Sequence, residues 1–401
     1  MISVDDAVAR ITTACSVTGS ERVDLAQAFG RVLASDVLAG ADQPPASVSA
    51  MDGYAVRLAD ATPGATLKLA GESAAGAPFA GLLRAGEAVR IFTGAVMPTG
   101  ADAILLQEDA EQAGDRVKAL AAANGRHVRV KGLDFRAGDL LVPAPRVLTA
   151  RDLALVAAGD QPALDVRRKP RVAIAATGDE LSRPGDPRKP GGIVASSLYG
   201  LSALVAQWGG EPHDLGILAD SIESIGALPQ LAGNADLVIT LGGASVGDHD
   251  LVQKALTSAG MELGFWRIAM RPGKPLMHGR LGAMRVLGLP GNPTSSMVCA
   301  ILFLRPLLRA LHGEPDAGAD PSQPARLAVD LGANGIRQDY MRASLARGAE
   351  GVLVATPAAD QDSSLVKTMA RADGLIIRPP HAPPAKAGDP CRVIAFHGLG
   401  V

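Results

Sequence analysis

The most regular pattern of apolar and polar residues lies between residues 170 and 313, where short apolar runs alternate with longer amphipathic ones. Short β-branched runs that end at glycine predict buried strands, and the amphipathic runs predict helices. We expect strands at residues 171–177, 235–243, 265–270 and 285–291, and helices at residues 196–209, 221–233, 249–260 and 293–313. This alternation predicts a mainly parallel sheet with helices on both of its faces.

The segments on either side of this region have other textures. Residues 3–15 and 149–158 show helical spacing, with Ser3 and Thr149 as the expected N-caps. Between them, short extended segments separated by Gly and Pro predict an all-β region. After a linker rich in Gly, Asp and Pro at residues 313–324, the short strands of the last segment predict a small β-barrel or sandwich.

The expected fold class is therefore a multidomain α/β plus β protein. Its parts are a helical and extended domain, an inserted β module, a central α/β domain and a C-terminal β-barrel domain. We expect these parts at residues 1–39 with 139–169, 40–138, 170–313 and 325–401, respectively.

Composition and charge exclude some classes of function. The formal net charge of −2 argues against a general nucleic-acid binder, although a local basic cluster still suffices for a small anion. Cys15, Cys299 and Cys391 lie far apart, which predicts neither a disulfide framework nor a cysteine metal site. No signal peptide is indicated, and the most apolar run, residues 297–308, is too short to span a bilayer. We expect a cytoplasmic protein without membrane contact.

Three strand ends carry the residues most suited to chemistry. Carboxyl ends of parallel strands meet at one edge of a sheet, and ligands bind there. Glycine-rich ends expose backbone N–H groups to anions, and a following helix start adds its positive dipole end. The candidate cofactor-binding residues at these ends are Thr177, Gly178, Gly242, Gly243, Ser245, Gly247, Pro290, Gly291, Asn292 and Pro293.

A basic turn and scattered carboxylates complete the candidate site. Prolines stiffen the turn at residues 270–275, which presents Arg271 and Lys274 together, and in a strand Arg267 shares a face with Arg271. Carboxylates without a His or Cys cluster favour a hard cation such as Mg²⁺. A satisfied structural role is expected for His278, which has no partner ligand at useful spacing. The candidate carboxylates are Asp52, Asp134, Glu180, Asp220, Asp248 and Asp250.

The segments SAMDGYAV, IFTGAVMPTGADAILLQED, GLDFRAGD, ATGDEL, GGASVGDHD, MRPGKP and GLPGNPTSS follow one another along nearly the whole chain. Together they resemble the molybdopterin molybdenumtransferase family, which includes the bacterial MoeA proteins and the C-terminal domain of gephyrin. The resemblance implies a four-domain chain that forms an elongated homodimer. It also implies insertion of molybdate into adenylylated molybdopterin, with release of AMP and formation of molybdenum cofactor, and it implies a divalent cation, usually Mg²⁺.

The resemblance also implies roles for residues. The positions that match the family's important residues are Asp52, Thr93, Asp134, Glu180, Asp220, Asp250, Arg267, Arg271, Lys274, Pro290, Pro293, Arg342 and Ser363. The position in the motif favours Asp250 as the functional carboxylate of the Gly-Asp-His-Asp stretch. A slip in the alignment would make Asp248 that carboxylate. Glu180 and Asp250 are expected to hold the metal at the pyrophosphate, Arg271 and Lys274 to grip a phosphate or oxyanion, and Asp52 to act from the β module across a cleft. That β module can belong to the other subunit.

Three other functions are alternatives to molybdate insertion. Molybdopterin adenylyltransferase shares the α/β domain type and would be a rival or a contact partner, but it is a single compact domain. A non-catalytic molybdopterin-binding scaffold would bind without turnover. A nicotinamide oxidoreductase is disfavoured because no G-x-G-x-x-G follows the first α/β strand.

Overall fold

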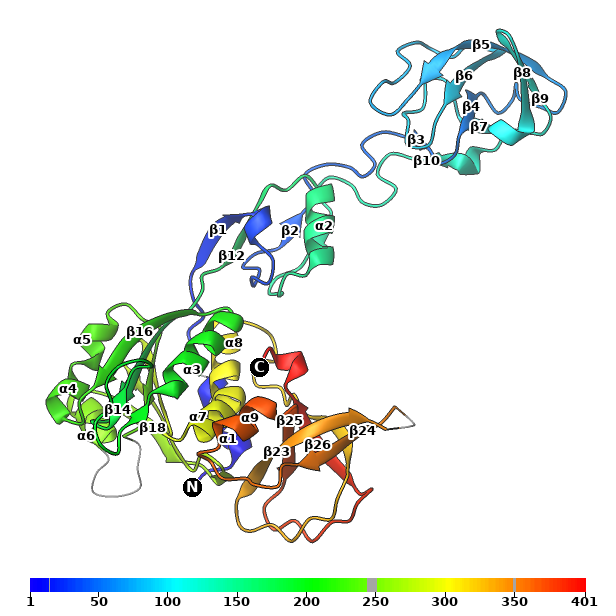
Figure 1. Cartoon of the computed structure of the whole chain (residues 1–401). Helices are drawn as coiled ribbons and strands as arrows, with labels where there is room; N and C mark the ends of the chain where they lie inside the picture. Colours follow the sequence, from blue (N-terminus) through cyan, green and yellow to red (C-terminus); the bar gives the residue numbers. More distant parts are fainter. Residues whose placement is uncertain (14, 244–250, 349–350) are drawn as a thin grey trace. The chain divides into compact units, whose positions relative to one another are not determined.

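The computed structural model describes residues 1–13, 15–243, 251–348 and 351–401. The chain divides into two compact units. Unit 1 contains Met1–Glu21 and Arg167–Val401, and unit 2 contains Arg22–Val166. Figure 1 labels the helices and strands of both units.

Unit 1 is built on a six-stranded sheet. In spatial order its strands are β16 (Glu211–Leu218), β13 (Arg171–Thr177), β17 (Leu237–Leu241), β21 (Met284–Leu289), β20 (Pro275–Leu281) and β18 (Glu262–Arg267). The first four run parallel, and the last two are antiparallel to their neighbours. The predicted mainly parallel sheet is confirmed. Its register pairs Ala176 with Leu241 and Leu241 with Leu289, so the three strand ends of interest lie at one edge.

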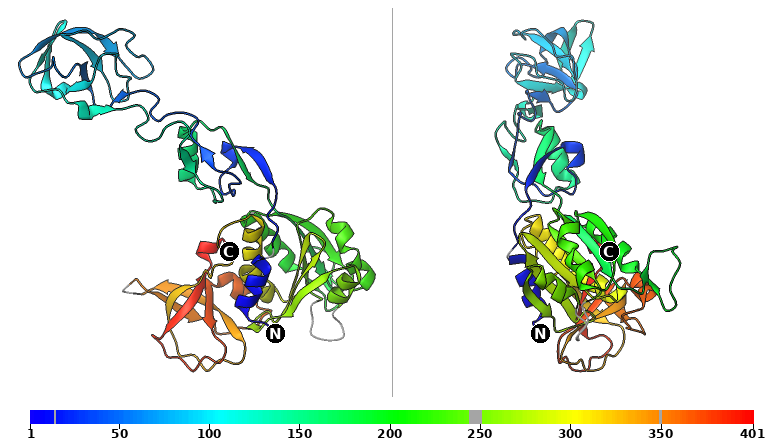
Figure 2. Two further views of the ribbon diagram at one scale, coloured as in Figure 1. Left: turned by 180° about the vertical axis from the view of Figure 1, so that it is seen from behind. Right: turned by 90° about the vertical axis from the view of Figure 1, so that its left-hand side faces the viewer.

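Helices cover both faces of this sheet, as Figures 1 and 2 show. Alternate strand residues pack against α3 (Ser196–Gln207) and the helical run α7 (Pro293–Cys299), η4 (Ala300–Leu304, a π-helix) and α8 (Arg305–Leu311). The other residues pack against α4 (Ile222–Gly226), α5 (Leu228–Ala232) and α6 (Leu251–Ser258). The helix expected at residues 221–233 is thus two short helices, and α5 begins next to Pro229.

The first helix belongs to unit 1. Helix α1 (Val4–Thr13) begins where Ser3 Oγ accepts a hydrogen bond from the Asp6 amide, as its sequence predicts. Its apolar residues Val4, Ala7 and Ile11 are buried in the same core as α3, α7 and α8. The expected helical and extended domain places residues 1–39 in one part. The structure instead divides them, because the apolar side of α1 is covered by the α/β core.

The run Pro293–Leu311 is long and apolar enough, by length and composition, to cross a membrane. It extends beyond the apolar run that the sequence suggests, and 83% of its most apolar window is buried inside the protein. Packing in the core of unit 1 therefore accounts for its apolar character.

The C-terminal part of unit 1 is a closed barrel. Its strands are β22 (Gln323–Leu327), β23 (Gln338–Arg347), β24 (Leu353–Pro357), β25 (Gly374–Arg378) and β26 (Pro390–Ala395). They pair in the order β23, β24, β22, β26, β25, and β25 returns to β23. This confirms the predicted barrel. Helix α9 (Val366–Arg371) connects β24 to β25, η5 (His397–Leu399) follows β26, and β19 (Met270–Arg271) joins the sheet beside β23.

Unit 2 contains the predicted β module. Its main sheet has the order β7 (Ala103–Leu106), β4 (Gly53–Val56), β6 (Glu87–Ile91), β5 (Thr66–Ser73), β9 (Arg116–Ala119) and β8 (Ala110–Ala113). Strands β3 (Val48–Ser49) and β10 (Val128–Arg129) form a separate pair, and η2 (Gln107–Asp109) and η3 (Gly125–His127) are short turns. The all-β texture of this stretch therefore predicts its structure correctly.

The ends of unit 2 form a smaller helical and extended region. It contains β1 (Ser20–Asp24), η1 (Leu25–Gln27), β2 (Val37–Leu38), β11 (Leu140–Val142), α2 (Ala150–Ala158) and β12 (Ala163–Arg167). Strand β1 pairs with β12, and β2 pairs with β11. Thr149 caps α2 as predicted, and Asp152 completes a capping box with it.

Candidate functional site

A cavity of about 610 Å³ lies at the carboxyl edge of the sheet in unit 1. The three strand ends singled out from the sequence meet there, since Thr177, Gly242 and Pro290 all line it. Their convergence follows from the parallel register of β13, β17 and β21. The predicted residues in its wall are Thr177, Glu180, Asp220, Gly242, Gly243, Pro290, Gly291, Asn292 and Pro293.

One side of the cavity is acidic. Glu180 follows β13 and Asp220 follows β16, so neighbouring strands bring both carboxylates to the same wall. Burial raises the pKa of Asp220, and the nearby charges of Glu180 and Asp179 raise it further. The charges of Glu180 and Asp179 beside Asp220 form an electrostatic environment that a cation would relieve.

The structure leaves the predicted metal ligands incomplete. Within residues 1–13, 15–243, 251–348 and 351–401, no group of three His, Cys, Asp or Glu side chains has the geometry of a metal site. Asp248 and Asp250 lie outside the described residues, as do Ser245 and Gly247. The pairing of Glu180 with Asp250 therefore stays a prediction.

Glycines shape the cavity where strands turn. Gly242 has a φ of +96°, and a Cβ placed there would lie 2.7 Å from the carbonyl oxygen of Thr177. At Gly178, which has a φ of +150°, a Cβ would lie 2.7 Å from a carboxylate oxygen of Glu180. At Gly242 both the backbone conformation and the close approach of the Thr177 carbonyl favour glycine, whereas at Gly178 only the backbone conformation does, because the carboxylate end of Glu180 can move away.

The third strand end links the α/β domain to the barrel domain. Asn292, the N-cap of α7, makes no capping hydrogen bond with its side chain. Its Nδ2 instead donates to Ser363 Oγ at 2.9 Å, and the Thr294 amide donates to the Ser363 carbonyl at 3.2 Å. Ser364 and Val366 also line the cavity. The barrel domain therefore supplies part of the wall, which brings the predicted Ser363 to the site.

The basic residues are arranged differently from the sequence expectation. Arg267 ends β18, whereas Arg271 lies on β19 of the barrel sheet, so the expected common strand face for Arg267 and Arg271 is wrong. Arg271 is paired with Asp339, and this hydrogen bond raises the pKa of its guanidinium. The guanidinium carbon of Arg267 lies 4.3 Å from the centre of the Trp266 ring. Lys274 accepts a backbone hydrogen bond from Ile268, and the next residue, Pro275, lines the cavity.

Arg342 is the most unusual of the predicted residues. It lies on β23 and is only 1% exposed. Its Nη2 donates to the Asp362 carbonyl at 3.0 Å, but its Nε has no hydrogen-bond partner among the described residues. Burial lowers the pKa of the guanidinium. The nearby charges of Asp339, Asp360 and Asp362 oppose this effect and offset part of the cost of burying the cation.

Unit 2 holds the other predicted residues. Thr93 donates to Asp52 Oδ1 from its amide at 2.7 Å and from its hydroxyl at 2.9 Å. These two hydrogen bonds lower the pKa of Asp52, so its carboxylate is held ionised and oriented. Asp134 lines a separate cavity of about 470 Å³ within unit 2, together with Gly94 and Arg129.

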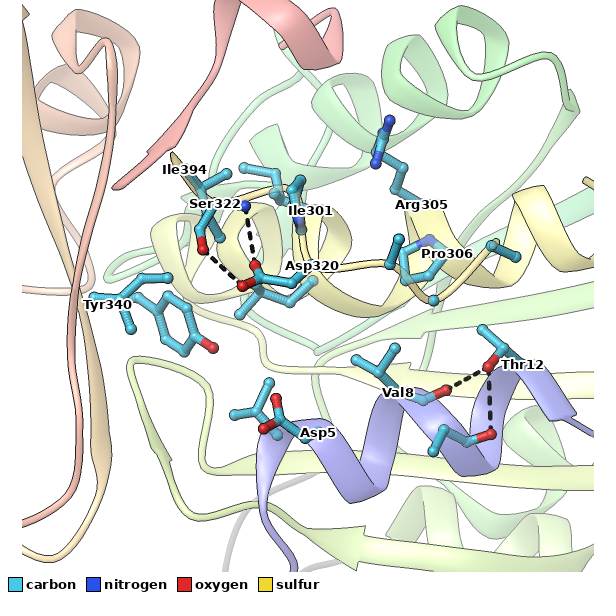
Figure 3. Close-up of a pocket in the computed structure, with 18 of the residues that line it drawn as sticks. Asp5, Val8, Thr12, Ile301, Arg305, Pro306, Asp320, Ser322, Tyr340 and Ile394 are labelled. Carbon is cyan, nitrogen blue, oxygen red and sulfur yellow. Dashed lines mark hydrogen bonds between the residues drawn. The ribbon is translucent and has the colours of Figure 1, made fainter. Parts of the chain in front are cut away.

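A further cavity of about 560 Å³ occurs in unit 1 (Figure 3). It is lined by residues of α1, the α7–α8 run, the linker and the barrel, including Asp5, Arg305, Asp320 and Tyr340. None of the predicted site residues lines this cavity, which is therefore distinct from the site at the sheet edge.

Some residues of the sheet-edge site are not predicted by the sequence patterns. Ser196 and Ser197 line the cavity at the start of α3, and Asp179 contributes to its charge. The serines precede an apolar run, which gives them the signature of a helix start. The pattern does not reveal that β15 (Ile193–Val194) pairs with β14 (Leu181–Ser182) and so directs this helix start into the cavity.

The fold and the site together define the class of protein. Residues 173–310 match the family model described as a probable molybdopterin binding domain. Residues 2–159 match the MoeA N-terminal region (domain I and II), and residues 324–396 match the MoeA C-terminal region (domain IV). The chain belongs to the MoeA family, the molybdopterin molybdenumtransferases.

Curated relatives support this membership along most of the chain. A molybdopterin molybdenumtransferase of Nostoc sp. is 41% identical over 81% of this chain and 77% of its own length. One of Haemophilus influenzae is 32% identical over 95% of both chains. Among solved structures, a molybdopterin biosynthesis MoeA protein from Pyrococcus horikosii has a TM-score of 0.86 at 30% identity and covers 99% of each chain.

Proposed function

We propose that this protein is a molybdopterin molybdenumtransferase, which inserts molybdate into adenylylated molybdopterin and releases AMP. The observation that carries the proposal is the sheet-edge cavity, where carboxylates, glycine turns and a helix start meet in the domain that matches molybdopterin-binding proteins. In this reaction molybdenum becomes bonded to the dithiolene sulfurs, and the phosphoanhydride bond that carries AMP is broken.

The charges of the proposed substrates explain why both anionic and cationic groups are proposed for the sheet-edge cavity. A diphosphate and molybdate repel each other unless cationic groups and oriented amides lie between them. Glu180 and Asp220 are suited to a hard cation, because both are carboxylates and the raised pKa of Asp220 reflects first its burial and then the nearby charges of Glu180 and Asp179. Mg²⁺ bound there would neutralise charge on the diphosphate and on the departing AMP. Asp250 is proposed as a further ligand from the motif alone.

The cationic side of the proposal rests on the barrel domain and the basic turn. Arg342 is proposed to hold an oxyanion, since its buried Nε lacks a partner among the described residues. Lys274, Arg267 and Arg271 are proposed to add positive charge, although Arg271 already serves Asp339. Ser363 would position Asn292, to which it is hydrogen-bonded.

The experiment follows AMP release from adenylylated molybdopterin in the presence of molybdate. Glu180→Gln and Asp52→Ala are compared with Glu223→Gln, whose residue is exposed on α4 and outside the cavity wall. We expect both site variants to lose activity by tenfold or more and the control to retain it. Unchanged turnover of either site variant removes that residue from the proposal, and absence of AMP release by the wild type rejects the function.

The two alternatives give different products. An adenylyltransferase would release pyrophosphate from ATP and molybdopterin, whereas a scaffold would bind molybdopterin without turnover. We expect neither result as the main activity. A transient contact with molybdopterin adenylyltransferase, which makes the substrate, is part of the proposal and is tested by direct binding of the two purified proteins.

We also propose a homodimer in the cytoplasm. Unit 2 exposes several large apolar side chains on its helical and extended region, including Phe29, which is 67% exposed, together with Leu38, Leu140 and Val147. Covering such residues favours association. Light scattering after size-exclusion chromatography is expected to give twice the chain mass, and a monomer at micromolar concentration would reject this part of the proposal.

A further inference from the structure

Helix α3 begins at the cavity without a cap. Its N-cap residue is Ala195, which has no side-chain acceptor. Within the described residues, the amides of Ser196 and Ser197 donate to no backbone or side-chain acceptor, and both residues line the cavity. A helix of this length concentrates partial positive charge at these N–H groups, so the start of α3 is suited to an anion.

A second observation on another element points to the same ligand. Thr177, at the end of β13, is 4% exposed and lines the same cavity. Its hydroxyl has no hydrogen-bond partner among the described residues. Gly242 and Gly243 pass close to this hydroxyl, because a Cβ on either residue would lie 3.2 or 3.1 Å from it. A buried hydroxyl without a partner is uncommon in native proteins and indicates a group that a ligand satisfies.

The connection to Glu180 narrows the chemistry of the anion. The Ile193 amide donates to the Glu180 carbonyl at 2.9 Å, and the Ala195 amide donates to the Ser182 carbonyl at 3.0 Å. These bonds tie the start of α3 to the backbone that carries the Glu180 carboxylate. An anion that binds beside a carboxylate needs several donors and tolerates a bridging cation, as a phosphate group does.

We propose that the amino end of α3 and the Thr177 hydroxyl form a phosphate-binding site, which holds the AMP phosphate of the diphosphate in adenylylated molybdopterin. The donors are the amides of Ser196 and Ser197 and the hydroxyls of Ser196 and Thr177. This inference rests on the proposed function. It adds to that function a place for the phosphate and residues that position it.

The chain offers a matched pair of variants for the test. Thr240 on β17 is also fully buried, and its hydroxyl also lacks a partner among the described residues, but it does not line the cavity. Thr177→Val and Thr240→Val each delete such a hydroxyl and keep the shape of the side chain. Neither variant is expected to lower the Tm, because no hydrogen bond within the protein is lost.

Calorimetric titration with AMP measures the effect of each variant on phosphate binding, and adenosine is the control probe that lacks phosphate. The comparison distinguishes the Thr177 hydroxyl from the Thr240 hydroxyl. We expect the wild type and Thr240→Val to bind AMP more tightly than adenosine. Thr177→Val is expected to bind AMP roughly ten- to hundredfold more weakly, as for loss of a hydrogen bond to a charged group, with adenosine binding unchanged. Equal AMP affinity in the two variants would overturn the inference.

A second variant tests the start of the helix itself. Ser196→Asp places a carboxylate in the first turn of α3, where it is expected to raise the Tm and to compete with phosphate. The wild type should gain Tm in inorganic phosphate over chloride of equal ionic strength, and the variant should not. A phosphate-dependent gain of the same size in Ser196→Asp contradicts the site. If the wild type binds neither AMP nor phosphate, the proposed function itself fails, whereas tight wild-type binding unaffected by these variants rejects the phosphate site alone.

Discussion

Gly242 offers the sharpest test of the cavity's geometry. Gly242→Ala would place a methyl group on a residue whose φ is +96°, with the new carbon 2.7 Å from the Thr177 carbonyl oxygen. That oxygen belongs to β13, which is held on both sides by β16 and β17, so it cannot easily move away. The left-handed conformation costs about 1–2 kcal/mol for a residue with a Cβ, and forced overpacking typically costs about 1–3 kcal/mol.

The two costs together predict a loss of about 2–5 kcal/mol in the free energy of unfolding of unit 1. For a unit of this size, such a loss lowers the Tm by roughly 4–20 °C. Gly291→Ala is the matched control, because Gly291 lies in the same cavity wall without a positive φ. A Cβ there meets its nearest atom, Gly242 Cα, at 3.4 Å, which is an ordinary contact.

Differential scanning calorimetry of both variants measures the effect. We expect Gly291→Ala to remain within about 1 kcal/mol of the wild type, while its added methyl group narrows the cavity and raises the KM for the adenylylated substrate. If Gly242→Ala unfolds at the same temperature as Gly291→Ala, the turn after β17 does not have the conformation on which the site depends.

Three further predictions concern charge. Arg342→Met removes a buried guanidinium whose only hydrogen bond within the described residues is to the Asp362 carbonyl. The Tm should therefore change by only a few degrees, while the KM for molybdate rises at least tenfold. An unchanged KM would show that this cation stabilises the fold and does not bind molybdate. Thr93→Val removes one of the two hydrogen bonds that lower the pKa of Asp52, so NMR titration of this carboxyl should show a higher pKa, whereas Thr93→Ser should keep the wild-type value. Because the pKa of Asp220 is raised in the folded protein, its carboxyl group loses the proton only above the pH at which an ordinary Asp does. The stability that this protonated carboxyl group contributes is therefore lost as the pH rises through the raised pKa. Asp220→Asn should therefore stabilise the metal-free protein at neutral pH and weaken the Tm gain caused by Mg²⁺, and a Mg²⁺ effect equal to that of the wild type would contradict a role in metal binding.

Local patterns predict the α/β architecture well. The apolar strands end at glycine or proline, and Ser3 and Thr149 cap their helices as expected. The convergence of Thr177, Gly242 and Pro290 also follows from the sequence, since parallel strands align their carboxyl ends. These features depend on nearest neighbours along the chain and on one topological rule, which is why they are predictable.

The basic residues show where such reasoning fails. Their spacing predicts one face of one strand, but the chain leaves the α/β sheet after Arg267 and enters the barrel sheet at Met270. Arg271 then meets Asp339, a residue distant in the sequence, and this ion pair reduces the charge available to a ligand. No periodicity encodes a pairing between sheets of two domains.

The amino-acid sequence predicts the alternation of strands and helices in the central domain, the all-β texture of the inserted module, and the motifs of the MoeA family, but it does not predict strand β16. These are properties of local hydrophobic periodicity, capping and turn chemistry. Three features emerge only from the folded chain: α1 packs in the α/β core, Arg342 is buried with an unused donor, and the uncapped start of α3 lines the same cavity as Thr177. The physical reason is that burial, unsatisfied donors and shared cavities arise from contacts between distant segments, whose free energies no local pattern records.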